Sequence, residues 1–178
     1  MKALSLTPQL TPQAALRHSF TKQDLELCSD GHLFGVGNAQ LPAAPLLLLD
    51  RITDIQTTGG EYEKGYAIAE LDIAPEDWFF KHHFRGDAVM PGCMLLESLW
   101  QLTGFHLAWS GYYGKGRVLD SGKTRFLESV SDTPQTLKIS IHVRKILTRG
   151  NPLCIANGEI MSNDALICRS NSIKMGLV

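Results

Sequence analysis

The chain has 178 residues and a net charge of −1, with 44% hydrophobic and 20% charged residues. This length fits one domain comfortably, and the composition is that of an ordinary globular protein rather than a disordered one. Because the net charge is close to zero, we expect no nucleic-acid partner, and no apolar run is long enough to cross a membrane.

The four cysteines, Cys28, Cys93, Cys154 and Cys168, show no C-x-x-C spacing. They are typical of reduced thiols in an intracellular protein rather than of a disulfide framework. The first residues never develop the apolar core of a secretion signal. We therefore expect a cytoplasmic protein.

The first 20 residues contain Pro8 and Pro12 and little periodicity, which predicts a mobile or loosely packed N-terminal arm before a single domain at 21–178. Thr21 and Asp24 have the spacing of a helix N-cap, and Gly31 would end that short helix. The apolar run from Leu46 to Ile52 fits either a buried strand or a helical turn, and its pattern does not decide between them.

Strand patterns dominate the rest of the chain. The clearest is the strict alternation of apolar and polar residues from Leu137 to Arg144, which predicts one buried face. The other predicted strands are Tyr62–Ile73, Gly116–Phe126, Leu153–Met161 and Ala165–Leu177.

One predicted helix interrupts these strands, from Cys93 to about Trp109. Its apolar residues cover nearly the whole circumference, which is typical of a helix buried on all sides. A buried helix among five or so antiparallel strands predicts an α+β fold in which a sheet wraps around one central helix.

Glu97 is the only charged residue between Asp87 and Lys115, and it lies on this apolar helix. A buried carboxyl group must be paired, be protonated or line a cavity. Gln101 follows four residues later and therefore shares its helix face. The alternative is an ordinary surface glutamate at a domain edge or subunit contact.

Pro91 and Gly92 precede the helix and are expected to leave free N–H groups at its positive end. A thioester or amide carbonyl placed there would be polarised, and Gly92 would let a ligand approach the backbone closely. A plain proline at the helix start is the common alternative. Cys93 could bind substrate at the same helix start. A nucleophilic role for its thiol is not indicated, because no base is obviously paired with it.

His83 is suited to act as a general base near neutral pH. His82 is its sequence neighbour, so in an extended segment the two rings point in opposite directions. A metal chelate from this pair is therefore not expected, and no other Cys/His cluster suggests a metal site.

The segment from Trp78 to Cys93 closely resembles the active-site segment of the 3-hydroxydecanoyl-acyl-carrier-protein dehydratase/isomerase family, whose members have the hotdog fold. The resemblance covers roughly residues 21–178 and extends to further landmarks: Leu33-Phe34-Gly35, Gln40-Leu41-Pro42-Ala43, Asp50-Arg51, Lys64-Gly65-Tyr66, Trp100-Gln101-Leu102, Gly114-Lys115-Gly116-Arg117 and Lys174-Met175-Gly176-Leu177.

This resemblance implies that His83 is the base acting at C2 of a (3R)-3-hydroxyacyl thioester, that Glu97 is the acid, and that the amide of Gly92 stabilises the oxyanion. It also implies a homodimer whose two sites lie at the interface, with no metal or organic cofactor. The substrate would arrive on an acidic acyl carrier protein, for which Arg149 and Lys174 are the preferred contacts.

Two residues depart from the family's pattern, since Glu97 stands where the decanoyl enzymes have aspartate and Ala88 where they have proline. Dehydration to the trans-2-enoyl thioester should survive, whereas isomerisation to the cis-3 product depends on finer proton placement. Three other readings stay open: an acyl-thioesterase of the same fold, a non-catalytic acyl-binding module, and a dehydratase of a specialised lipid or polyketide pathway.

Overall fold

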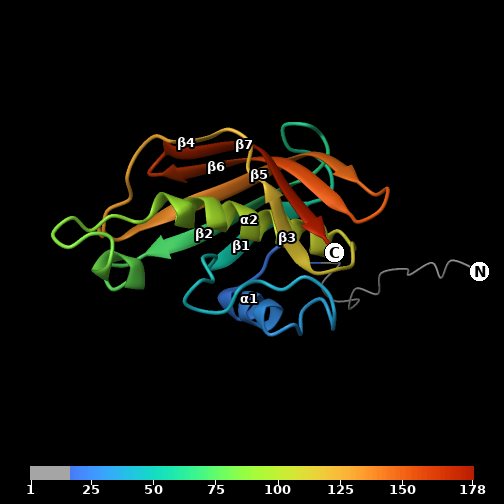
Figure 1. The fold of residues 1–178 in the computed structure, drawn as a ribbon, viewed down its shortest axis with the longest axis horizontal. Helices are drawn as coiled ribbons and strands as arrows, with labels where there is room; N and C mark the ends of the chain where they lie inside the picture. Colours follow the sequence, from blue (N-terminus) through green and yellow to red (C-terminus); the bar gives the residue numbers. More distant parts are fainter. Residues whose placement is uncertain (1–16) are drawn as a thin grey trace, which may run out of the picture.

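The computed structural model describes residues 17–178 and forms one antiparallel sheet around a long helix (Figure 1). The elements are, in chain order, α1 (Lys22–Ser29), β1 (Arg51–Gln56), β2 (Tyr66–Ile73), a short 3-10 helix (Trp78–Lys81), α2 (Gly92–Trp109), β3 (Gly116–Asp120), β4 (Thr124–Phe126), β5 (Gln135–Leu147), β6 (Leu153–Ser162) and β7 (Ala165–Leu177).

The sheet has the strand order β1-β2-β5-β6-β7-β3, and β4 also pairs with β7. All of these pairings are antiparallel. Helix α2 lies across the sheet, and α1 packs at the side near β1 (Figure 1). The predicted α+β fold, a sheet wrapped around a central helix in the hotdog arrangement, is confirmed.

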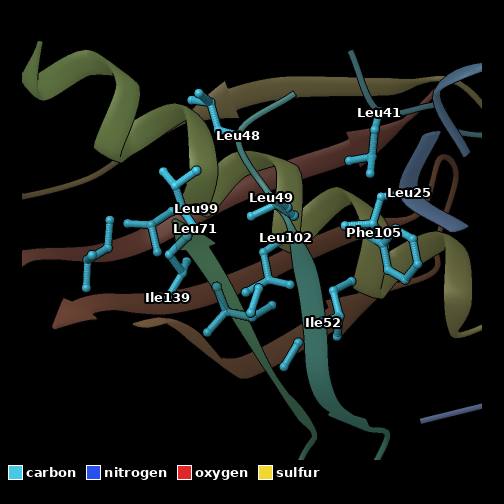
Figure 2. Close-up of a cluster of buried hydrophobic side chains, with 14 of the residues drawn as sticks. Leu25, Leu41, Leu48, Leu49, Ile52, Leu71, Leu99, Leu102, Phe105 and Ile139 are labelled. Atoms are coloured by element: carbon cyan, nitrogen blue, oxygen red, sulfur yellow. The ribbon is translucent and has the colours of Figure 1, made fainter. Parts of the chain in front are cut away.

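The core fills the space between α2 and the concave face of the sheet. Leu99 and Leu102 of α2 lie against Leu49, Leu71 and other apolar side chains of the sheet side (Figure 2). In β5 the buried side chains alternate as the sequence predicts, at Leu137, Ile139, Ile141 and Val143. Burial of these side chains supplies the main favourable term in folding, at about 25 cal/mol per Å² of apolar surface.

The undecided segment 46–52 belongs to neither predicted class for most of its length. It runs without regular secondary structure up to Asp50, with Leu47, Leu48 and Leu49 buried, and only from Arg51 does it enter β1. A side chain of α2 satisfies part of its backbone, so a regular partner strand is not needed there.

The predicted strand 116–126 is split into β3 and β4 by residues 121–123, which include Gly122. This glycine has φ 49°, and a Cβ atom there would lie 2.0 Å from the carbonyl oxygen of Asn171. The sequence placed the strand correctly but did not reveal that β7 approaches so closely.

The predicted start of α1 is confirmed. The Thr21 side chain accepts from the Asp24 N–H, while the Asp24 carboxylate accepts from the Thr21 N–H, so both halves of a capping box are present. Residues 1–16 of the proposed N-terminal arm lie outside the described residues. Phe20 is buried and pairs with Ile52 through two backbone hydrogen bonds.

His106 connects the end of α2 to β1 and gives the fold a pH-dependent component. Its Nε2 donates to the carbonyl oxygen of Gln56 at 3.0 Å, and burial lowers the pKa of the ring below its ordinary value of about 6.5. Below that value the unfolded chain takes up a proton that the folded chain resists, so stability falls as the pH drops below about 6.5.

We therefore expect wild-type unfolding free energy to decline on acidification with a His106 component of up to about 1.4 kcal/mol per pH unit. His106→Gln keeps a donor for Gln56 but removes the titration. Urea unfolding of both proteins between pH 5 and pH 8 measures the difference. Parallel pH profiles would contradict this role.

Within residues 17–178, no helix combines the length and the hydrophobicity that crossing a membrane requires.

Candidate active site

Glu97 lies half-buried on α2, and a glutamine holds its side chain in place. Gln101 Nε2 donates to Glu97 Oε1 at 3.0 Å and to the carbonyl oxygen of Leu46 at 2.7 Å, while Gln101 Oε1 accepts from the Leu48 N–H at 3.0 Å. The amide is therefore fixed on both sides by the backbone of the irregular segment. One carboxylate oxygen of Glu97 is thereby oriented, and the other accepts no hydrogen bond from residues 17–178.

A largely apolar cleft of about 160 Å³ opens beside this carboxylate. One wall is the α2 face that carries Glu97, Gln101 and Phe105, and the opposite wall comes from residues 39–42 and from the sheet edge. Its lining residues are Cys28, Phe34, Ala39, Gln40, Leu41, Pro42, Glu97, Trp100, Gln101, Gly104, Phe105, Gly116, Val118 and Met175. An apolar cleft with one acid at its side suits an apolar substrate with a single polar reacting group.

Helix α2 begins at Gly92, one residue before the predicted start at Cys93. No described side chain caps it, and Pro91 occupies the capping position. The first N–H groups are thus not satisfied by a side chain and lie at the positive end of the helix dipole. A Cβ atom on Gly92 would lie 3.3 Å from the ring of Phe126, a side chain that is half exposed on β4.

His83 lies half-buried in the loop that leads into α2. Its Nδ1 is 2.9 Å from the carbonyl oxygen of Val89, and its ring stacks on Phe84 with centroids 3.8 Å apart. A carbonyl can only accept, so the proton of this contact belongs to Nδ1. In neutral His83 the lone pair is therefore on Nε2, as a general base requires.

The walls of the cleft beside Glu97 do not include His83. Loop 82–91 instead lies against residues 130–131, through Met90 N to Val130 O and the Val89–Ser131 bridge. His83 therefore does not line the cleft that contains Glu97, whereas Gly92 directly follows the loop that carries His83.

The remaining predicted site residues lie elsewhere. Cys93 is exposed in the first turn of α2. Arg149 is exposed in the turn between β5 and β6, whereas Lys174 is engaged by Asp120 in an ion pair of 2.7 Å. Among the described residues, no group of three histidine, cysteine or acidic side chains is placed to hold a metal ion.

The two residues that fix Gln101, and through it Glu97, were not predicted from the sequence. Leu46 and Leu48 contact Gln101 through backbone atoms, which leave no trace in a residue pattern. The segment between Phe34 and Pro42 also contributes much of the cleft, and although parts of it were landmarks of the family resemblance, the sequence assigned them no role in the site.

Replacing Gln101 by leucine is expected to lower both stability and turnover. The buried Leu48 N–H loses its acceptor, which costs about 1–3 kcal/mol, and Glu97 loses its orienting donor. We expect kcat to fall more than KM rises. Thr103→Ala is the matched control, because it removes a buried hydrogen bond to Leu99 O in the same helix without touching Glu97.

Thermal unfolding and turnover of the two variants then separate positioning from stability. If Thr103→Ala lowers turnover as much as Gln101→Leu at equal loss of stability, Gln101 has no positioning role.

An antiparallel sheet wrapped around one central helix places this protein in the hotdog fold class. The chain belongs to the FabA-like domain family, whose sequence model matches residues 41–171.

Solved structures of low sequence identity share the fold. A dehydratase heterocomplex, ApeI:P from Xenorhabdus doucetiae, aligns with a TM-score of 0.54 at 15% identity, over 76% of this chain and 86% of that one. An uncharacterised protein from Pyrococcus horikoshii aligns with a TM-score of 0.54 at 11% identity, over 74% of this chain and 84% of that one. A hypothetical thioesterase with coenzyme A from Streptococcus pneumoniae aligns with a TM-score of 0.51 at 13% identity, over 71% of this chain and 84% of that one.

Proposed function

We propose that this protein is a dehydratase that converts (3R)-3-hydroxyacyl thioesters, carried on an acyl carrier protein, to trans-2-enoyl thioesters. The observation that carries the proposal is that the chain holds both an oriented acid in an apolar cleft and a histidine whose Nε2 has no hydrogen-bond partner among residues 17–178. Glu97 is oriented by Gln101, and His83 is oriented by Val89 O.

In the proposed reaction His83 Nε2 removes a proton from C2, and electron density moves onto the thioester oxygen. The N–H groups at the start of α2, Gly92 first among them, stabilise that oxygen. Glu97 then donates a proton to the hydroxyl at C3, so the C3–O bond breaks and water leaves. The residues alternate between acid and base in the reverse reaction.

Because His83 is not among the residues that line the Glu97 cleft, we expect a second copy of the chain to complete the site. Strand β3 is at the edge of the sheet, and its Val118 and Leu119 are 43% and 57% exposed. Neighbouring Phe126 and Leu127 are each 52% exposed. An apolar strand edge invites pairing with another strand, and a symmetric dimer there would cover it.

The carrier protein is expected to meet basic side chains near the entrance. Arg149 makes no ion pair within the described residues, so its charge is available to an acidic partner. Lys174 would have to leave Asp120 to do the same. Arg149 is therefore the stronger of the two proposed contacts.

Product analysis with 3-hydroxydecanoyl thioester, on carrier protein or on a pantetheine mimic, tests the proposal. We expect a trans-2-enoyl product. An additional cis-3 product would make the protein a dehydratase/isomerase despite Glu97. Release of free acid would instead support the thioesterase, and binding without turnover would support an acyl-binding module.

A further inference from the structure

Two glycines line the cleft beside Glu97 although their backbone does not require glycine. Gly104 lies within α2, and Gly116 begins β3. Neither has a left-handed φ, unlike most glycines of this chain. Glycine is less stable than alanine inside a helix, so its presence at position 104 needs another cause.

Packing does not supply that cause. The three atoms nearest to a Cβ atom on Gly104 all belong to the Met175 side chain, the closest at 3.6 Å, and the nearest atom to one on Gly116 is Ala39 Cβ, at 4.0 Å. Both distances are ordinary van der Waals contacts. By contrast, a Cβ atom on Gly158 of β6 would lie 2.7 Å from Leu99 Cδ2, so close packing explains that glycine.

We propose that Gly104 and Gly116 keep the cleft wide enough for the acyl chain of the substrate and thereby set the longest chain accepted. The inference rests on the proposed acyl-thioester substrate. Both glycines border the same cleft as Glu97, and the space that their missing side chains leave is open to a ligand.

Aromatic rings border the cleft further along α2 from Glu97. Phe34 and Phe105 pack edge to face with centroids 5.0 Å apart, and Phe105 also packs on Phe20 at 4.9 Å. All three side chains are buried. Figure 2 shows Phe105 beside Leu25 and Leu41, at the end of the core near α1.

These boundaries indicate medium-length chains. Glu97 and Phe105 are eight positions apart, or about 12 Å along a helix that rises 1.5 Å per residue. An extended chain advances about 1.2 Å per bond, so at most about ten bonds fit. The cleft volume of about 160 Å³ is close to that of a cavity known to hold benzene. The cleft can therefore hold at least about six carbon atoms of an acyl chain.

Gly104→Ala and Gly116→Ala each add one methyl group to the cleft and test the proposal. We expect kcat/KM for the longest accepted 3-hydroxyacyl pantetheine thioester to fall by about 10–200-fold, the effect of one methylene in an apolar pocket. The shortest substrates should change little. Phe34→Leu removes ring volume from the opposite wall and should extend the accepted length.

Thermal unfolding controls for misfolding, because alanine at position 104 should not lower the stability of α2. An unchanged chain-length profile in both glycine variants would overturn the proposal. Thermal shifts with saturated acyl-pantetheine ethers of the same lengths report the width of the cleft without turnover. Wild-type protein that binds these ethers by length but dehydrates nothing would contradict only the proposed reaction.

Discussion

Replacing His83 by alanine is expected to lower kcat/KM for dehydration by about 10²–10⁴-fold, the contribution typical of a positioned general base. The ring is held through Nδ1 by Val89 O, which leaves Nε2 as the lone-pair nitrogen. Alanine cannot accept the C2 proton. The His83 side chain contacts Val89 and Phe84, and neither could replace it as a base. Steady-state kinetics with a 3-hydroxyacyl thioester measures the loss.

His82→Ala is the matched control for this experiment. His82 is the sequence neighbour of His83 and is exposed, so its loss should leave kcat/KM close to wild type. A thermal unfolding scan of His83→Ala checks that the missing contact with Val89 has not unfolded the loop. Near-wild-type turnover of a folded His83→Ala protein would remove His83 from the mechanism.

The fold could be predicted because its two largest signals are local. Helix α2 is apolar around its circumference, and β5 alternates strictly, so burial follows from the order of residues alone. The predicted start of α2 differed from the observed one by a single residue. Gly122 was not predicted as a strand break, because its cause is the close approach of Asn171 from β7.

The site could be predicted only in part, because some of its contacts are local in the sequence and others are long-range. Glu97 stood out because a lone charge on an apolar helix is costly unless something compensates for it. The compensation comes from Gln101, whose amide is in turn fixed by backbone atoms more than 50 positions away. The cleft likewise joins α2 to residues 34–42 and to β3, and such long-range contacts have no periodic signature.

Glu97 and Gln101 also suggest why a glutamate can serve in this position. The hydrogen bond between them spans one helical turn, so the longer side chain is held along α2 rather than left to extend freely. Its carboxyl group is directed along the same face as the cleft. In the proposed mechanism, the acid needs only to reach the C3 hydroxyl of the substrate.

Mixing two inactive variants is expected to restore activity if the proposed dimer completes each site. His83→Ala and Glu97→Ala should each lose about 10²–10⁴-fold alone. In a randomly assembled mixture, roughly half of the dimers contain one subunit of each kind, and such a dimer has one intact site when the histidine and the acid come from different chains. Turnover should therefore recover to about a quarter of wild type.

The same mixture separates the two possible arrangements of the site. If His83 and Glu97 of one chain acted together, every site in a mixed dimer would lack one of them, and the mixture would stay as inactive as its parents. Substituting a charge for Leu119 on the β3 edge provides the control, because a dimer formed there should weaken and recovery should fall with it. If activity still recovers when both variants also carry Leu119→Glu, the dimer interface does not lie at this edge.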